Sequence, residues 1–475
     1  MLGAVAGRLP SLDGRSVTLG GRTLPLAPRA AVAAVVGEIT SMPRGLRLWF
    51  AFLLGVCGLA AIAALIALPP GWEVFGTTPS FEWGLLIIGY VFFAITTSGL
   101  CLASSLGTVF GIERFRPLEK RHAILALLCL IAAFGIIALD LHYPVRMVFG
   151  AMFVPSPSSP MWWMGVFYGV YLVVLVVEVW SMFTHHPRIH QAACTMAAGT
   201  AIVAPATLGA VFGVLVARPF WHGPFTPVLM VATAFLSGVA LLAVVFFAVA
   251  RLRLAGSDRV ATVAMPAIRL LLGVGLVVVS LLVARHVAAG LSSDRPGYVA
   301  ATEALLFGPL AAQFWGVRVA IGLALPIVLL VLPRTRTVTG TFVAGLGAII
   351  GVFADRFTFV AAGQIAPTTS VSGTVSSPFA GYTPSPVEVL IVLGAAAFVA
   401  LGYTLAERYL DLGESDDHIG GSLAAMRGAL RRLPRPRVDL VATLRRRGPA
   451  GAEARPAGAE TRPTADPGRE PEAAR

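Results

Sequence analysis

Ten long apolar stretches constrain this chain more than any other feature of its sequence. They lie at about 46–69, 83–111, 121–141, 161–184, 191–217, 227–250, 266–289, 313–332, 338–363 and 385–407. Each has about the 20 apolar residues that a helix needs to cross a bilayer. Only 13% of the 475 residues are charged, roughly half the share of a soluble domain. The sequence therefore predicts an all-α, polytopic integral membrane protein with about ten transmembrane helices.

Basic residues predict the orientation of these spans. If the N-terminus is cytoplasmic, most of the 36 lysines and arginines fall in cytoplasmic loops and tails, which is the positive-inside pattern. Both termini are then cytoplasmic, and the chain is a multi-pass protein of the cell membrane. The net charge of +12 follows from this topology, so it does not indicate a nucleic-acid partner.

The composition divides the chain into three regions. Residues 1–44 form a cytoplasmic N-terminal arm, residues 45–411 the transmembrane domain, and residues 412–475 a basic, Pro/Ala-rich cytoplasmic tail. The tail lacks the apolar content for a core and is expected to be largely disordered. Within it, residues 421–432 fit a short amphipathic helix on anionic lipid or a solvated segment that only fixes topology. The apolar segment 297–312 is short and is expected to be a re-entrant or interfacial helix.

Ionisable residues within the spans gather toward the predicted outer face. The group comprises Asp140, His142, Arg146, Arg285, His286, Arg318, Asp355 and Arg356. Because charges inside a membrane are costly, they mark functional candidates, and a pocket for a polar head group would explain their asymmetry. Arg146 is equally consistent with a cation that snorkels to the interface. Glu178, in the inner half of its span, fits either a proton relay or a hydrogen-bonded structural acid.

Two further patterns concern the packing of helices. Small and hydroxyl residues are frequent at 96–107 of the second span, which favours close helix packing over ligand contact. Asp355 and Arg356 are neighbours, and neighbouring side chains on a helix point about 100° apart. Each is therefore expected to pair with another helix rather than with the other.

The cysteines and histidines argue against a resident redox group. Cys57, Cys101, Cys129 and Cys194 lie in apolar runs without C-x-x-C spacing, so they are expected to be buried structural thiols. The histidines lie in loops, in tails or near helix ends rather than in the facing mid-span pair that haem b requires. No intrinsic haem, iron–sulfur cluster or metal is expected. The sequence also has no P-loop motif and no dinucleotide fingerprint.

A series of local motifs runs in order from residue 83 to residue 388. They are Trp83-Gly84 at a helix start, VFGIERFRPLEK (109–120), DLHYPVRM (140–147), SSPMWWM (158–164), the Tyr171–Glu178 spacing, ARPFWHGPFTP (217–227) and GYTPSPVE (381–388). Together they resemble the NrfD / polysulfide-reductase membrane-subunit family, which includes HybB-like quinone-interacting subunits. The family has a glycine where this chain has His142.

The resemblance implies two helical bundles and a role as the membrane subunit of a multi-subunit respiratory oxidoreductase. Such subunits bind menaquinone or ubiquinone as an exchangeable ligand near the outer face. They exchange electrons with an iron–sulfur partner that serves a molybdenum (molybdopterin) or nickel–iron catalytic subunit.

Specific site residues follow from the family motifs together with the polar groups found within the spans. The quinone-binding candidates are Asp140, His142, Arg146, Trp83 and Tyr90. Proton transfer is assigned to Asp140 and Glu178. The structural and polar residues assigned to the second bundle are Arg318, Arg356, Tyr382 and Glu388.

Two other functions stay open. A secondary transporter is favoured by Pro205 and Pro326, which interrupt spans, although such a protein places its polar groups near the bilayer midplane. A passive membrane anchor without a quinone site is the second alternative. Co-purification with an iron–sulfur partner would favour the respiratory role.

Overall fold

The computed structural model describes residues 12–13, 16–19, 22–25, 43–68, 71–79, 81–141, 155–184, 186–254, 256–365, 381–410 and 412. The chain divides into two compact units, residues 1–427 and 428–475, and all the described residues belong to the first. Three short strands, β1 (Leu12–Asp13), β2 (Ser16–Leu19) and β3 (Arg22–Pro25), form an antiparallel sheet in the order β1-β2-β3.

Ten helical segments of the described chain are long and apolar enough to cross a membrane. They are α2 (Arg44–Ala67), α3 (Leu85–Thr108), α4 (Glu119–Asp140), α6 (Pro160–Phe183), α7 (Pro187–Gly213), α8 (Phe225–Arg251), α9–η3–α10 (Ser257–Leu291), η4–α12 (Ala312–Val331), α13 (Val338–Ile365) and α14 (Pro386–Tyr409). Every predicted span overlaps one of them, so the prediction of a ten-span, all-α membrane protein is confirmed.

Short elements connect these spans. They are the 3-10 helices η1 (Gly71–Val74), η2 (Glu113–Leu118) and η5 (Pro333–Thr335), and the α-helix α11 (Pro296–Leu306). The helix α11 corresponds to the short apolar segment noted in the sequence, and it packs against α10 (Met265–Leu291) and α13. Two spans contain π-helical turns, at η3 (Val260–Ala264) and η4 (Ala312–Ala324).

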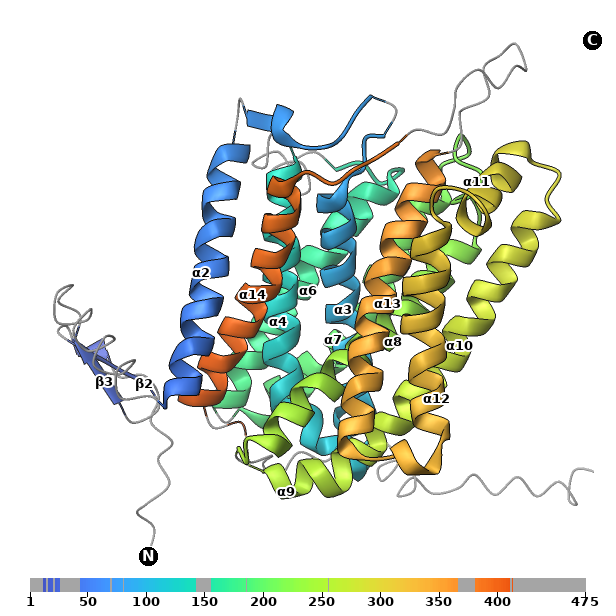
Figure 1. Ribbon diagram of the computed structural model, residues 1–475. Helices are drawn as coiled ribbons and strands as arrows, with labels where there is room; N and C mark the ends of the chain where they lie inside the picture. The colour runs from blue at the N-terminus through green and yellow to red at the C-terminus, as the bar shows by residue number, and fades with distance from the viewer. Residues whose placement is uncertain are drawn as a thin grey trace, which may run out of the picture. The chain divides into compact units, whose positions relative to one another are not determined.

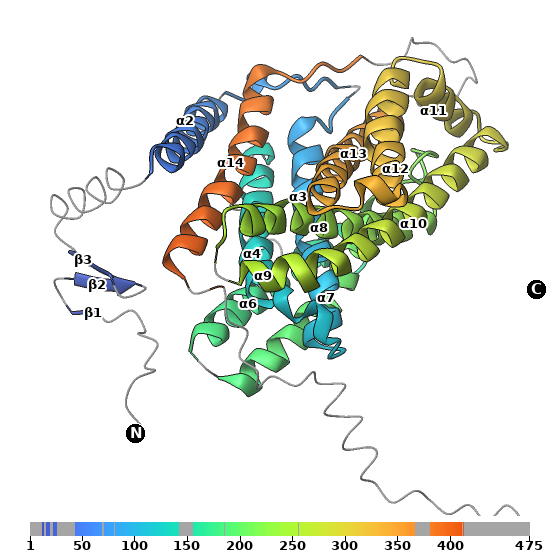
Figure 2. The same ribbon diagram turned by 60° about the horizontal axis from the view of Figure 1, so that its bottom comes forward.

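The spanning helices run side by side, from α2 and α14 at one edge to α10 at the other (Figure 1). Eight of the spans form two four-membered rings that share one contact surface. In the first bundle, α3, α4, α6 and α7 pack in a closed ring, and in the second bundle α8, α10, η4–α12 and α13 do the same. The rings meet chiefly where α3 packs on α8. The remaining pair, α2 and α14, lies beside the first bundle with α14 against α4 (Figure 2).

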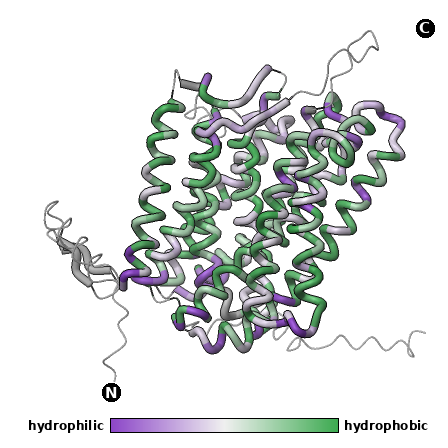
Figure 3. Tube along the Cα trace, in the orientation of Figure 1, coloured by the Kyte–Doolittle hydropathy of each residue, from purple (hydrophilic) through white to green (hydrophobic). Residues whose placement is uncertain are grey.

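Burial follows from this arrangement. The span of α3 is 83% buried, whereas that of α2 is only 22% buried, so α3 is central and α2 is peripheral. Apolar residues run through the middle of the helices, and polar residues gather at their two ends (Figure 3). This is the distribution that a helix bundle needs in a hydrocarbon environment.

Glycines allow the two bundles to approach closely. A Cβ atom on Gly99 of α3 would collide with the backbone of Ala234 in α8, and one on Gly238 of α8 would collide with the backbone of Gly99. The Thr96 hydroxyl also lies 3.2 Å from the Ser237 hydroxyl across the same contact. The small and hydroxyl residues of the second span therefore serve helix packing, as predicted.

Candidate functional site

Glu388 joins three segments at one end of the first bundle. It is the third residue of α14 and forms a capping box with Ser385, so its carboxylate also satisfies the positive end of the helix dipole. Its Oε2 atom accepts from the backbone N–H groups of Gly76 at 3.1 Å and Ser385 at 2.8 Å. Its Oε1 atom accepts from the Tyr382 hydroxyl at 2.8 Å and the Leu85 N–H at 3.3 Å. The carboxylate thus fixes the start of α3 against the start of α14.

Tyr382 and Glu388 do not belong to the second bundle, contrary to the prediction. Helix α14 packs against α2 and α4, and both residues contact the start of α3. The prediction failed because the last span leaves the second bundle to pair with the first. Gly84 permits the close contact, since a Cβ there would lie 2.6 Å from Glu388 Oε1 and 2.9 Å from the Tyr382 hydroxyl oxygen.

Asp140, the last residue of α4, lies within electrostatic reach of this pair. Burial raises the pKa of Tyr382, and the charges of Glu388 and Asp140 raise it further. The Asp140 side chain is half-buried. No side chain of the described residues forms an ion pair or a hydrogen bond with its carboxylate. Two acids and a tyrosine hydroxyl therefore gather at one end of the first bundle.

Trp83 is held beside this cluster by two hydrogen bonds from its backbone to the Gln364 side chain. Its backbone N–H donates to Gln364 Oε1 at 2.9 Å, and its carbonyl accepts from Gln364 Nε2 at 3.0 Å. Its ring stacks on Trp221 with centroids 5.0 Å apart and planes inclined by 13°. Tyr90 is buried further along α3, with its hydroxyl 3.5 Å from Met164 Sδ. His142 and Arg146 lie outside the described residues.

Glu178 belongs to a second buried cluster, at the other end of the first bundle. Its Oε1 atom lies 3.2 Å from His122 Nε2 of α4 and 3.6 Å from Cys194 Sγ of α7. Next to them, His190 Nε2 lies 2.9 Å from Glu119 Oε1. All five side chains are buried. Sequence reasoning found only Glu178, although the i, i+4 spacing of His190 and Cys194 was a signal for the rest.

Buried hydroxyls lie between the two clusters. Tyr168 and Tyr171 of α6 are 1% and 0% exposed, respectively. Ser98 and Thr97 of α3 are both 0% exposed. The Tyr171 hydroxyl lies 3.4 Å from the Thr97 carbonyl oxygen, to which it donates. The interior of the first bundle is therefore lined with polar groups along much of its length.

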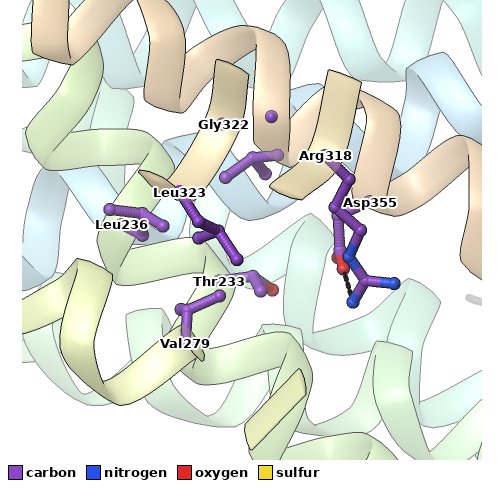
Figure 4. Close-up of a pocket in the computed structure, with 9 residues that line it drawn as sticks. Thr233, Leu236, Val279, Arg318, Gly322, Leu323 and Asp355 are labelled. Carbon is purple, nitrogen blue, oxygen red and sulfur yellow. Dashed lines mark ion pairs between the residues drawn. The ribbon is translucent and has the colours of Figure 1, made fainter. Parts of the chain in front are cut away.

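The second bundle holds a separate charged cluster around Asp355. Its carboxylate pairs with Arg318 of η4 (Figure 4). It also pairs with its own neighbour Arg356. The expected pairing with another helix is confirmed, whereas the expectation that Asp355 and Arg356 would not pair is wrong. Arg356 also donates to Thr233 of α8 at 3.1 Å. All three charged side chains are buried.

A small cavity adjoins this cluster. Its volume is about 10 Å³, which is close to the space that one buried water requires. Thr233, Arg318 and Asp355 contribute to its wall, together with the glycines Gly322 and Gly351 (Figure 4). This cavity is too small for a quinone ring.

A family model and several known proteins are similar to this chain. The model of the family "Polysulphide reductase, NrfD" matches residues 73–368. The "Hdr-like menaquinol oxidoreductase integral membrane subunit" of Archaeoglobus fulgidus is 25% identical over 375 residues, 74% of this chain and 92% of that protein. A selenate reductase subunit of Mesobacillus selenatarsenatis is 24% identical over 363 residues, 68% of this chain and 83% of that protein. A protein of Halobacterium salinarum, named as a dimethyl sulfoxide reductase membrane subunit, is 28% identical over 409 residues, 76% of this chain and 89% of that protein.

Proposed function

The chain belongs to the polysulphide reductase NrfD family, and we propose that it binds a quinone beside Asp140 and exchanges electrons between it and a partner subunit. Its general role is that of an integral membrane subunit of a respiratory oxidoreductase, which is supported by relatives named as subunits of an oxidoreductase or of reductases. The relative from Archaeoglobus fulgidus is named as part of a menaquinol oxidoreductase, which supports a quinone as the membrane-soluble reactant.

The cluster at the end of α4 carries the proposal. Oxidation of a quinol releases two electrons and two protons, so the site needs a base beside the hydroxyl that loses its proton. Asp140 supplies that base, because its carboxylate has no partner among the described residues. The neighbouring Glu388 is unsuitable, since four donors already occupy its two oxygens. Trp83 and Tyr90 lie toward the same end of α3 and offer aromatic surface to the ring.

His142 and Arg146 extend the proposed site. Both follow Asp140 closely in the motif DLHYPVRM (140–147). An imidazole can take a second proton near neutral pH, and a guanidinium can donate to a quinone carbonyl. Arg146 is a candidate through the motif that resembles the family, whereas His142 replaces the family's glycine and is a candidate because it follows Asp140 by two residues.

The polar interior of the first bundle suggests a route for protons. Glu178 lies at the far end from Asp140, and the hydroxyls of Tyr168 and Tyr171 lie between them. A chain of hydroxyls and acids can pass protons when the groups are connected by hydrogen bonds or water. We assign Glu178 as the acid that exchanges protons at the inner end of this route.

The partners and orientation complete the proposal. Electrons pass to or from an iron–sulfur subunit that serves a molybdopterin or nickel–iron catalytic subunit. The quinone end faces the outside of the cell membrane, with both termini cytoplasmic, because this orientation places most arginines inside. The quinone is an exchangeable ligand rather than a resident group.

The Asp140→Asn variant tests the site. We expect the purified complex to lose about 100-fold in kcat/KM for quinol oxidation, the order expected for loss of a general base. The matched control is Asp294→Asn, an exposed acid of the connection between α10 and α11. Quinol turnover of Asp140→Asn equal to that of the control would show that the quinone reacts elsewhere. A chain that purifies without an iron–sulfur partner would contradict the proposed electron route.

A further inference from the structure

Three metal-binding side chains from two helices meet at the end of the first bundle opposite Asp140. His190 Nε2 of α7 lies 2.9 Å from Glu119 Oε1 of α4 and 3.5 Å from Cys194 Sγ, one turn along α7. The three donor atoms all lie within 4.8 Å of one another. All three side chains are buried, with exposed fractions of 7% for Glu119, 1% for His190 and 4% for Cys194.

Ser181 determines which nitrogen of His190 carries a hydrogen. The Ser181 hydroxyl donates to the Glu178 carbonyl oxygen at 2.9 Å, so toward His190 Nδ1, at 3.3 Å, its oxygen can only accept. Nδ1 therefore bears the hydrogen, and in a neutral imidazole Nε2 presents a lone pair. That lone pair faces a carboxylate oxygen and a thiol sulfur. Three electron-rich atoms within 4.8 Å of one another, two of the distances being 2.9 and 3.5 Å, call for a cation between them, either a proton or a metal ion.

The surrounding contacts are those that support a metal site. A metal-bound histidine usually donates its other ring N–H to an oxygen that fixes the ring, as His190 does here to Ser181. A cysteine must lose its proton before its sulfur binds a metal. Glu178 Oε1, 3.6 Å from Cys194 Sγ, is a base within reach of that proton. The second oxygen of this carboxylate is buried and has no hydrogen-bond partner in the described part of the chain.

We infer that Glu119, His190 and Cys194 bind a divalent transition metal, zinc in the first place. One carboxylate, one imidazole and one thiolate form a borderline donor set that suits Zn²⁺ and not Mg²⁺ or Ca²⁺. Metal–ligand bonds of about 2.0–2.3 Å in a tetrahedral site separate the donors by roughly 3.3–3.7 Å. The 3.5 Å between sulfur and nitrogen fits this range, and the 2.9 Å between nitrogen and oxygen requires only a small movement of the Glu119 carboxylate.

The site lies at the opposite end of the first bundle from the proposed quinone, next to Glu178 of the proposed proton route. Glu119 begins α4 and Asp140 ends it, which separates the two sites by about 30 Å along the helix. The metal ion would link α4 to α7, which lie on opposite sides of the ring formed by the first bundle. Its direct effect would therefore be on the assembly of this bundle, because the metal would not touch the quinone.

Metal content of the full chain tests the inference. The protein is purified in detergent with a tag that contains no histidine, together with its associated subunits, from cells grown with zinc. The variants are Cys194→Ser and His190→Ala, and the matched control is Cys57→Ser, a cysteine of α2 whose sulfur lies 3.9 Å from the Gly394 carbonyl oxygen. Elemental analysis counts zinc per chain, with iron counted separately for any iron–sulfur partner. Replacement of zinc by Co²⁺ then reports a thiolate ligand through its charge-transfer absorption in the near ultraviolet.

The expected result is about one zinc per chain in the wild type and in Cys57→Ser, as for a single site with three protein ligands. Zinc should fall about tenfold or more in Cys194→Ser and His190→Ala, and the cobalt–thiolate band should be absent from Cys194→Ser. A wild-type chain without zinc and without that band would overturn the inference and leave a protonated His190 paired with Glu119. The cobalt spectrum of the wild type decides the question even if a variant does not fold.

Discussion

The hydroxyl of Tyr382 donates to the carboxylate of Glu388 across 2.8 Å, and this contact closes the end of the first bundle at which Asp140 lies. The same hydroxyl oxygen lies 2.6 Å from the Leu85 N–H at the start of α3. The Tyr382 ring stacks on Phe81 with centroids 4.5 Å apart and planes inclined by 4°. Because these contacts join the start of α3 to the start of α14, they fix the position of both helix ends near Asp140.

Glu388→Gln should weaken this junction. The amide of glutamine would place a donor against two of the four donors that now face the carboxylate. We expect the free energy of unfolding to fall by about 3 kcal/mol, the scale for losing hydrogen bonds to a charged group and leaving buried donors unpaired. Thermal unfolding in detergent measures the change. Glu82→Gln, which alters an exposed acid near the start of α3, should change stability by less than about 0.5 kcal/mol; equal losses in both variants would contradict the role given to Glu388.

Tyr382→Phe should change how stability depends on pH. The pKa of Tyr382 is raised in the folded chain by burial and by Glu388, so above about pH 10 the unfolded chain loses this proton first. Stability is then lost as the pH rises, by about 1.4 kcal/mol per pH unit for one proton. At neutral pH the variant should be less stable by about 1 kcal/mol through the lost hydrogen bond. The difference should shrink above about pH 10 in thermal unfolding, and a constant difference to about pH 11 would argue against the raised pKa.

The spans were predictable because hydropathy is a local property. Each apolar run was long enough to define a helix before any tertiary contact was considered, and α2 to α14 follow those runs closely. The position of α14 was not local information. Its face pairs with α2 and α4, and nothing within residues 386–409 distinguishes that partner from the second bundle. This is why Tyr382 and Glu388 were assigned to the wrong bundle.

Asp140 was predictable both from its place at the end of an apolar span and from its motif, whereas Glu388 was predictable from its motif alone. Asp140 and Glu388 came from separate motifs, and the structure brings both to the environment of Tyr382. The cluster of Glu119, His122 and His190 escaped prediction because residues at helix ends ordinarily face water or head groups. Three helix ends converge here and bury them. Such convergence depends on the ring of α4, α6 and α7 and on no single segment.

Gly99→Ala should separate the two bundles. A Cβ at this position would collide with the backbone of Ala234, and backbone cannot move aside as a flexible side chain does. We expect a loss of about 1–3 kcal/mol in the free energy of unfolding, as for overpacking of a core. Gly135→Ala of α4 is the matched control, because a Cβ there meets nothing within 4 Å and alanine favours the helix by about 1 kcal/mol. Thermal unfolding should therefore shift in opposite directions, and a loss of similar size in both would refute the packing argument.

Replacing Asp355 alone should lower the free energy of unfolding more than replacing Asp355 and Arg318 together. Asp355→Asn leaves Arg318 and Arg356 buried without a counter-charge, which we expect to cost about 3–5 kcal/mol. Adding Arg318→Met removes one of these charges and replaces it with an apolar side chain. The double variant should then recover at least about 1 kcal/mol relative to Asp355→Asn, since a buried ion pair exchanged for apolar residues is often neutral. Unfolding measured for the wild type, both single variants and the double variant gives the coupling energy directly. A double variant no more stable than Asp355→Asn would mean that Arg318 does not share the charge of Asp355.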